Sequence, residues 1–315
     1  MIVTLTLNPS VDRTVEVETL ARGEVMRALG GRVDPGGKGI NVSRALAAHG
    51  RQTRAVITLG GAEGDHLVTL LRDTGIEIVA VPIRGAIRSN ITVVEPDGTT
   101  TKINEPGAEL SADELAAVFS AVQQAVASAD WLVASGSLPP GTPTDVYADL
   151  VNLLAGSGTN VAIDTSGPAL EAVLPACPTL VKPNRDELAE AVGRRLLTIS
   201  DVVAAAGELR DRGARTVLAS LGAEGAVLVD DDGAVHGRTA PVATVSTVGA
   251  GDAMLAGFLA GGGKGSDALV EALAWGAAAA RQPGSGMPSP ADIDRSAVRL
   301  ERHDIQRGDL LAMPP

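Results

Sequence analysis

One carboxylate stands beside two glycines at the start of an apolar run with the composition of a buried helix. The residues Gly249, Ala250, Gly251 and Asp252 precede the run 253–260. Small residues at a helix start leave its first N–H groups accessible, and the helix dipole adds partial positive charge there. These groups can bind a phosphoryl group, while an adjacent aspartate takes a proton from a hydroxyl. The alternative is an acidic cap of the helix, but glycine is a poor helix former and two of them favour catalysis.

A second glycine-rich segment, DPGGKGINVSRAL at 34–46, also enters a predicted helix. Its glycines allow close backbone approach, and Lys38 adds a cation. The segment is not a P-loop, because Lys38 is followed by Gly39 rather than Ser or Thr and the glycine spacing differs. A tight turn with a solvated lysine is the open alternative.

Three polar segments follow predicted strands. KPNRDEL at 182–188 carries Asn184 and Glu187, which form either a helix-capping pair or a carboxylate site near Mg²⁺ and phosphates. SLGAEGA at 220–226 is a nucleotide contact or a turn, and SGSLPPG at 135–141 is a rigid substrate edge or a rigid loop.

The elements that position these segments alternate between short apolar runs and helical patterns. Buried strands are predicted at 2–8, 53–60, 131–137, 160–166, 179–184 and 216–222. The clearest helix covers 111–129 and opens with a capping box of Ser111 and Glu114. This alternation predicts a doubly wound α/β fold, with a mostly parallel sheet flanked by helices on both faces. Ligands bind such sheets beyond the carboxyl ends of the strands.

Two segments interrupt the alternation. Residues 15–34 are strand-like without a helix, and 88–104 read as a hairpin around the turn 96–98. We expect one small β-sheet that covers the strand ends as a lid; two ordinary surface hairpins are the alternative. The predicted core is 1–9, 36–81 and 106–315, and the predicted lid is 10–35 and 82–105. The tail after about residue 288 is expected to be peripheral.

Composition excludes several classes of protein. The 315 residues carry a net charge of −12, which argues against nucleic acid as a partner. One cysteine allows no internal disulfide, and the four histidines show no metal-ligand spacing. No basic, apolar leader and no bilayer-spanning run are found, so we expect a cytoplasmic protein without a membrane partner.

The joint order of these motifs resembles the ribokinase-like (PfkB) carbohydrate kinases, in the branch of 1-phosphofructokinase and tagatose-6-phosphate kinase. The resemblance runs from TLNPSVDRT (6–14) to GSGMP (284–288) and includes GEVMR (23–27), INEPG (103–107) and TVGAGDAM (247–254). It implies a kinase that uses ATP and Mg²⁺, with a small β-lid on the α/β core.

The resemblance also implies roles for single residues. Asp252 would be the general base, and Gly249, Ala250 and Gly251 would supply the anion-binding N–H groups. The sugar would be bound by Asp12, Gly37 and Asn41, with Ser137 nearby. Asn184 and Glu187 would organise ATP phosphates and Mg²⁺, Glu187 through water. The nucleotide side would be lined by Lys182, Ser220, Gly222 and Gly225.

A substrate that already carries a phosphate would explain three cations, Arg27, Lys38 and Arg88, which fall in or beside the lid and the first glycine-rich loop. We therefore predict phosphorylation of fructose 1-phosphate at its 6-hydroxyl, favoured by Lys38 in GGKG. Tagatose 6-phosphate and fructose 6-phosphate are alternative acceptors, and a non-catalytic sugar-phosphate binder is a further alternative. A dinucleotide oxidoreductase fits the fold class but lacks the glycine fingerprint. An exposed lid edge would suit a homodimer.

Overall fold

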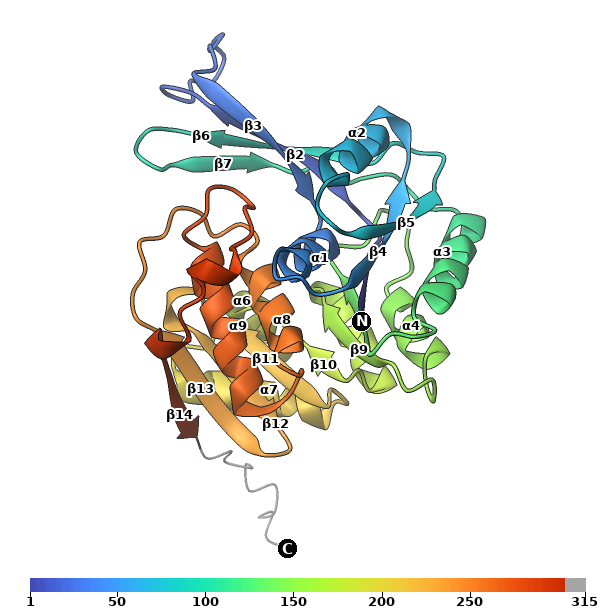
Figure 1. The fold of residues 1–315 in the computed structure, drawn as a ribbon, viewed down its shortest axis with the longest axis vertical. Helices are drawn as coiled ribbons and strands as arrows, with labels where there is room; N and C mark the ends of the chain where they lie inside the picture. Colours follow the sequence, from blue (N-terminus) through green and yellow to red (C-terminus); the bar gives the residue numbers. More distant parts are fainter. Residues whose placement is uncertain (304–315) are drawn as a thin grey trace, which may run out of the picture.

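The computed structural model describes residues 1–303, which form two β-sheets of different size (Figure 1). The larger sheet has ten strands, in the order β5 (Glu77–Pro82), β4 (Thr53–Leu59), β1 (Ile2–Thr6), β8 (Trp131–Ser135), β9 (Asn160–Asp164), β10 (Leu180–Val181), β11 (Thr216–Ser220), β12 (Ala226–Asp230), β13 (Gly233–Thr239) and β14 (Val298–His303). Strands β5 to β11 are parallel, and β12, β13 and β14 continue the sheet in antiparallel fashion.

All six strands predicted from the sequence belong to the parallel part of this sheet. The sequence analysis did not identify β5, β12, β13 and β14. Strand β14 lies in the tail that was expected to be peripheral, and it forms the edge of the sheet beside β13. Strands β5 and β14 are the two edges of this sheet, where most side chains are partly or fully exposed, so their hydrophobic pattern is weak.

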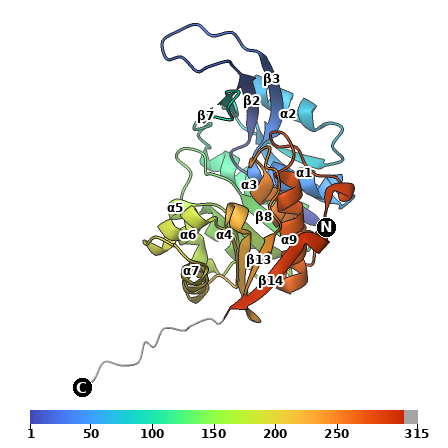
Figure 2. The same ribbon diagram turned by 90° about the vertical axis from the view of Figure 1, so that its left-hand side faces the viewer.

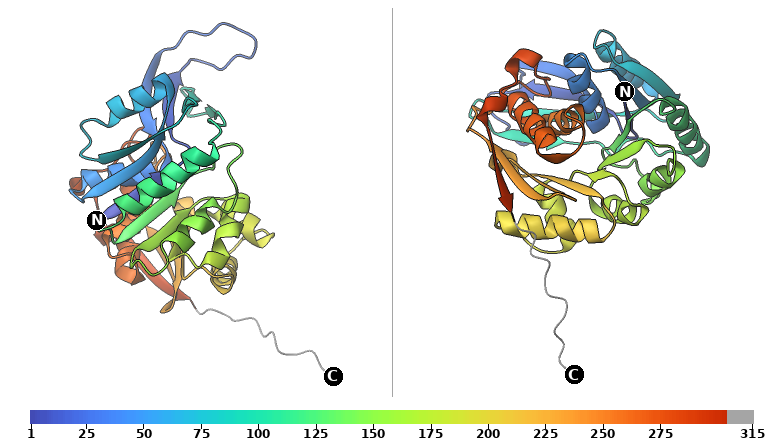
Figure 3. Two further views of the ribbon diagram at one scale, coloured as in Figure 1. Left: turned by 90° about the vertical axis from the view of Figure 1, so that its right-hand side faces the viewer. Right: turned by 60° about the horizontal axis from the view of Figure 1, so that its bottom comes forward.

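Helices cover both faces of the large sheet (Figures 2 and 3). One face packs against α1 (Lys38–Ala48), α2 (Gly61–Leu71), α8 (Ala250–Ala260) and α9 (Gly265–Ala279). The other face packs against α3 (Ala112–Ala125), α4 (Val146–Leu153), α5 (Gly167–Val173), α6 (Arg185–Val192) and α7 (Ile199–Asp211). In β1, Ile2 packs with the first group, whereas Val3 and Leu5 pack with the second, as strand alternation requires. The predicted doubly wound α/β class is confirmed.

The predicted capping box at the start of α3 is also present. The Ser111 hydroxyl accepts a hydrogen bond from Glu114 N, and the Glu114 carboxylate accepts one from Ser111 N. The helix ends at Ala125, four residues before the predicted end at 129. Within residues 1–303, no helix has the length and apolar character needed to cross a membrane.

The smaller sheet has four strands, in the order β3 (Gly30–Gly36), β2 (Ser10–Glu16), β6 (Arg88–Val94) and β7 (Thr100–Ile103). The predicted hairpin is confirmed as β6 and β7, joined by a turn in which Gly98 has a φ of +87°. The stretch 15–34 is extended only at its ends, and 17–29 form an irregular loop in which Val25 is 97% exposed. Val17 at the start of this loop is buried, whereas Val25 and Leu29 are exposed.

The small sheet stands at the end of the molecule where β1 ends and α1 begins (Figure 1). Strand β2 starts four residues after the end of β1, and β3 leads directly to Gly37 and α1. The sheet therefore lies beyond the carboxyl end of the parallel strands, where ligands bind in this class of fold.

Candidate active site

Two glycine-capped helices, α1 and α8, meet at the centre of the site. Gly37 caps α1 with a φ of +124°, and a Cβ there would lie 2.8 Å from Thr6 Cγ2. Gly249 caps α8 with a φ of +78°, as expected for the predicted helix start. Asn41 Nδ2 in α1 donates a hydrogen bond of 2.9 Å to Asp252 Oδ2 in α8. The two glycine-rich motifs of the sequence therefore converge on one carboxylate.

Asp252 is only 7% exposed, although it lies in the first turn of its helix. Burial raises the pKa of Asp252 to about 6, and the negative charge of Asp164 adds to this rise. The hydrogen bond from Asn41 and the charges of Lys38 and Lys182 oppose it. A carboxylate with a pKa close to neutrality is suited to general-base catalysis, whereas a simple helix cap would be solvated.

The side chain of Asp164, at the end of β9, is fully buried between two lysines. Lys38 Nζ donates a hydrogen bond of 2.7 Å to Asp164 Oδ1. Lys182 Nζ lies 3.0 Å from Oδ2 as an ion pair without hydrogen-bond alignment. Burial opposes ionisation of Asp164, but the two lysines outweigh it and lower its pKa. Asp164 was not among the predicted site residues; its position at the end of a predicted strand was the available signal.

Lys38, which was predicted to bind the phosphate of the acceptor, reaches the end of β9. Its Nζ contacts Asp164 and lies 3.6 Å from Glu187 Oε1. Burial opposes its charge, yet Asp164 and Glu187 raise the pKa of Lys38 above its usual value. As the first residue of α1, Lys38 reaches toward the end of β9, whereas Arg88 lies on the small sheet.

Asn184 and Glu187 form a capping box, which was one of the two interpretations of this segment. Asn184 Oδ1 accepts a hydrogen bond of 2.9 Å from Glu187 N, and Glu187 Oε2 accepts one of 2.8 Å from Asn184 N. The pair starts α6 and also lines a cavity. Glu187 can therefore cap α6 through Oε2 and still offer Oε1, which lies near Lys38, to a ligand in the cavity.

A cavity of about 820 Å³ collects most of the residues predicted to act on a nucleotide, and its size is typical of small-molecule sites. The predicted residues among its lining are Lys38, Lys182, Asn184, Glu187, Ser220, Gly222, Gly225, Gly249, Ala250, Gly251 and Asp252. Apolar side chains, including Val242, Met254 and Leu273, form one wall. Such a wall suits a planar base, while the lysines and the N–H groups at the start of α8 suit phosphates.

A second group of predicted residues lies where the small sheet meets the core. Asp12 accepts hydrogen bonds from Ser10 Oγ at 2.7 Å and Asn90 Nδ2 at 2.9 Å. Arg88 donates to Asn8 O at 3.1 Å through Nη2, and Asn8 Nδ2 donates to Ser137 Oγ at 3.3 Å. The structure thus connects Arg88 and Ser137 through Asn8.

Arg27 is not brought to this group. It lies in the exposed loop 17–29, and no contact joins it to the other predicted residues within the described part of the chain. Its role in phosphate binding stays a prediction.

Two further arginines near the site escaped the sequence analysis. Arg44 Nη1 donates to Asn41 Oδ1 and Ser285 Oγ, each at 3.1 Å. Burial lowers the pKa of Arg44, and the nearby carboxylates, Asp34 first among them, oppose this shift. Arg32 pairs with Asp34 at 2.6 Å and packs so closely on Gly284 that a Cβ there would clash. The signal for Arg44 was its spacing, three residues after Asn41 on one helix face.

One known protein family matches most of this chain. Residues 5–291 match the model of the pfkB family carbohydrate kinases. The chain is 37% identical over 300 residues to ATP-dependent 6-phosphofructokinase isozyme 2 of Mycobacterium tuberculosis, with 93% of this chain and 88% of that protein covered. It is 40% identical over 263 residues to 1-phosphofructokinase of Xanthomonas campestris, with 82% and 83% covered.

A solved structure matches the fold of this protein over most of the chain. Phosphofructokinase-2 from Escherichia coli, crystallised in complex with substrates and products, matches with a TM-score of 0.86 and 36% identity. The match covers 92% of this chain and 96% of that chain. The predicted family and fold class are confirmed, and the protein is a phosphotransferase. The chain belongs to the pfkB family of carbohydrate kinases.

Proposed function

We propose that the protein transfers the γ-phosphoryl group of ATP to the 6-hydroxyl of fructose 1-phosphate, giving fructose 1,6-bisphosphate and ADP. The observation that carries this proposal is the position of Asp252. Asp252 borders the cavity lined by lysines and glycines. Its hydrogen-bond partner Asn41 also accepts a hydrogen bond from Arg44. One buried base between a nucleotide-sized cavity and a polar acceptor region suits transfer from one ligand to another.

The chemistry requires little more than positioning and charge. Asp252 takes the proton as the hydroxyl oxygen attacks the γ-phosphorus, and ADP leaves in line. The N–H groups of residues 249–251 and the ammonium groups of Lys38 and Lys182 face the charge that builds up on the phosphoryl oxygens. We propose this role for Lys38, because it is paired with Asp164 and Glu187. Fructose 1-phosphate as the acceptor is then supported by the similarity to 1-phosphofructokinase of Xanthomonas campestris rather than by Lys38.

Mg²⁺ fits the same cavity by the chemistry of its donors. Glu187 offers a carboxylate oxygen, and Mg²⁺ prefers oxygen ligands and retains its waters. We propose that Glu187 holds the ion through water, where it would neutralise charge on the nucleotide phosphates.

The segments 10–35 and 82–105 are proposed to act as a lid on the core formed by 1–9, 36–81 and 106–315. Lid closure would exclude water and limit ATP hydrolysis. The edge strand β7 leaves Ile103 57% exposed, which supports pairing of two copies through the lid. Sedimentation at the mass of a single chain would argue against that dimer.

Ranking acceptors tests the proposed reaction. ADP release with Mg²⁺ and ATP should give the highest kcat/KM with fructose 1-phosphate, compared with fructose 6-phosphate and tagatose 6-phosphate. If fructose 6-phosphate or tagatose 6-phosphate gave the highest kcat/KM, that sugar would replace fructose 1-phosphate as the proposed acceptor. The sugar would then bind in the opposite orientation, with Asp252 still acting as the base. Absence of turnover with all three would contradict the proposed reaction.

Replacing Arg88 tests the acceptor side of the site. Arg88→Ala should raise KM for the sugar phosphate at least about tenfold, because a charge-assisted hydrogen bond is lost. KM for ATP should change far less. The matched control is Arg84→Ala, since the Arg84 side chain is 83% exposed and forms an ion pair with Glu114 at 3.7 Å. Equal effects of Arg88→Ala on both KM values would move Arg88 out of the acceptor site.

A further inference from the structure

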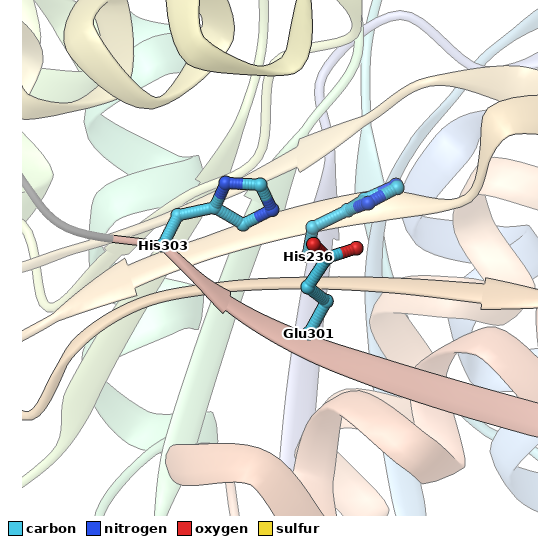
Figure 4. A group of neighbouring side chains, drawn as sticks. All are labelled: His236, Glu301 and His303. Carbon is cyan, nitrogen blue, oxygen red and sulfur yellow. The ribbon is translucent and has the colours of Figure 1, made fainter.

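Three side chains able to bind a metal ion converge on β13 and the edge strand β14, and none of them lines the cavity of about 820 Å³. They are His236, Glu301 and His303, and one ligand atom from each lies within 4.8 Å of the others. Figure 4 shows the three side chains on the same side of the two strands. The sequence predicted no metal site among the histidines, because these residues lie on separate segments.

The strand register explains why they converge. His236 lies directly opposite Glu301 in the antiparallel pair, and His303 lies opposite Ala234. Directly opposed residues share a face of the sheet, and residues two apart on one strand do so as well. The register of β13 and β14 therefore places all three side chains on one face of the sheet.

The hydrogen bonding of the two imidazoles is what a metal site requires. His236 Nε2 lies 2.8 Å from the backbone oxygen of Glu224. When Nε2 donates its proton there, Nδ1 keeps a free lone pair, and metal-binding histidines are typically oriented by such a bond to a carbonyl. His303 Nε2 is buried and has no hydrogen-bond partner among the described residues. A buried ring nitrogen without a partner is unfavourable, and a bound ion would satisfy it.

We propose that His236, Glu301 and His303 bind one divalent transition-metal ion of the Zn²⁺ class, which clamps β14 to β13. Two imidazoles and one carboxylate suit Zn²⁺ and its neighbours, whereas Mg²⁺ and Ca²⁺ prefer oxygen ligands. A tetrahedral ion with bonds of about 2.0–2.2 Å brings ligand atoms roughly 3.4 Å apart, so small side-chain rotations close the site, with water as the fourth ligand.

Charge on the same face makes Glu301 important to this site. Arg238 and Arg299 lie opposite each other on β13 and β14. Arg238 is two residues after His236, and Arg299 is two residues before Glu301. The Arg299 guanidinium donates to the backbone oxygens of Ser296 and Val298. The carboxylate of Glu301 must therefore offset nearby positive charge when a cation binds.

Calorimetric titration of the full chain with Zn²⁺, without nucleotide, tests the proposal. Millimolar Mg²⁺ is kept in the solution to occupy oxygen-only sites. Wild type should show one site, and His236→Ala, Glu301→Gln and His303→Gln should each weaken it by more than about 100-fold. Two matched controls should bind Zn²⁺ as wild type does: His66→Ala, on the distant helix α2, and Glu187→Gln, in the nucleotide-sized cavity.

Thermal unfolding supplies an independent readout. Because the ligands come from two strands, Zn²⁺ should raise the Tm of wild type and of His66→Ala, but not of the three ligand variants. Unchanged Tm values of the variants without metal show that they fold. Wild type that binds no Zn²⁺, retention of binding in all three ligand variants, or its loss in Glu187→Gln would overturn the proposal.

Discussion

Replacing Asp252 with asparagine should lower kcat by about 10²–10⁴-fold, which is the usual contribution of a general base. Asparagine keeps the size of the side chain and a hydrogen-bonding partner for Asn41, but it cannot accept the proton. Binding of ATP and of the sugar phosphate should persist, because the carboxylate contributes to the transition state rather than to ground-state binding. Steady-state kinetics, together with calorimetric binding of each substrate, measure the two effects separately.

The matched control for this variant is Asp267→Asn. Asp267 also lies in the first turn of a helix, α9, but it is exposed. Its replacement should leave kcat unchanged. Near-normal turnover in Asp252→Asn would remove the base from the proposed mechanism.

The same residue predicts the pH dependence of the reaction. Asp252 must be ionised to act, and its pKa is raised to about 6. kcat/KM should therefore fall about tenfold per pH unit below about 6 and level off above it. Because the folded-state pKa exceeds the unfolded value, keeping Asp252 ionised at pH 7 costs folding free energy. Asp252→Asn should unfold at the same temperature as wild type or higher, so loss of activity would not reflect loss of fold.

Replacing Asp164 with asparagine should lower the free energy of unfolding by about 3–5 kcal/mol, as expected when one partner of a buried ion pair is removed. Lys182 is only 4% exposed, and Lys38 shares the same carboxylate. Without Asp164, the buried ammonium group of Lys182 loses its partner and faces Lys38, whose side chain is 35% exposed. Urea denaturation at pH 7 measures the difference.

The control for Asp164 is an exposed ion pair. Glu208→Gln removes the partner of Arg194 on the surface and should cost less than about 1 kcal/mol. The pKa of Asp164 is lowered in the folded state, so its contribution is present at neutral pH and is lost as pH falls below about 3.8. A loss in Asp164→Asn as small as that in Glu208→Gln would show that the lysines relax into solvent.

Asp164 also influences the base. Its negative charge helps to raise the pKa of Asp252. In Asp164→Asn the acid limb of the pH–rate profile should therefore move to lower pH. A profile that keeps its position would show that the charge of Asp164 does not raise the pKa of Asp252.

Features that depend on short segments of the chain could be predicted from the amino-acid sequence. The starts of α1 and α8 follow from Gly37 and Gly249, and the start of α3 follows from the box of Ser111 and Glu114. The parallel strands were recognisable because buried strands read as continuous apolar runs. Backbone torsion preferences and hydrophobic periodicity are local properties, so they can be read along the chain without knowledge of the fold.

The tertiary structure alone decided which charged groups meet. Asp164 binds Lys38 and Lys182 because β9 and β10 are neighbours in the sheet and α1 starts beside them. His236, Glu301 and His303 converge only because of the register between β13 and β14. Electrostatic and ligand-binding interactions act over a few ångströms in space, and the order and register of strands that create those distances are not local properties of the sequence.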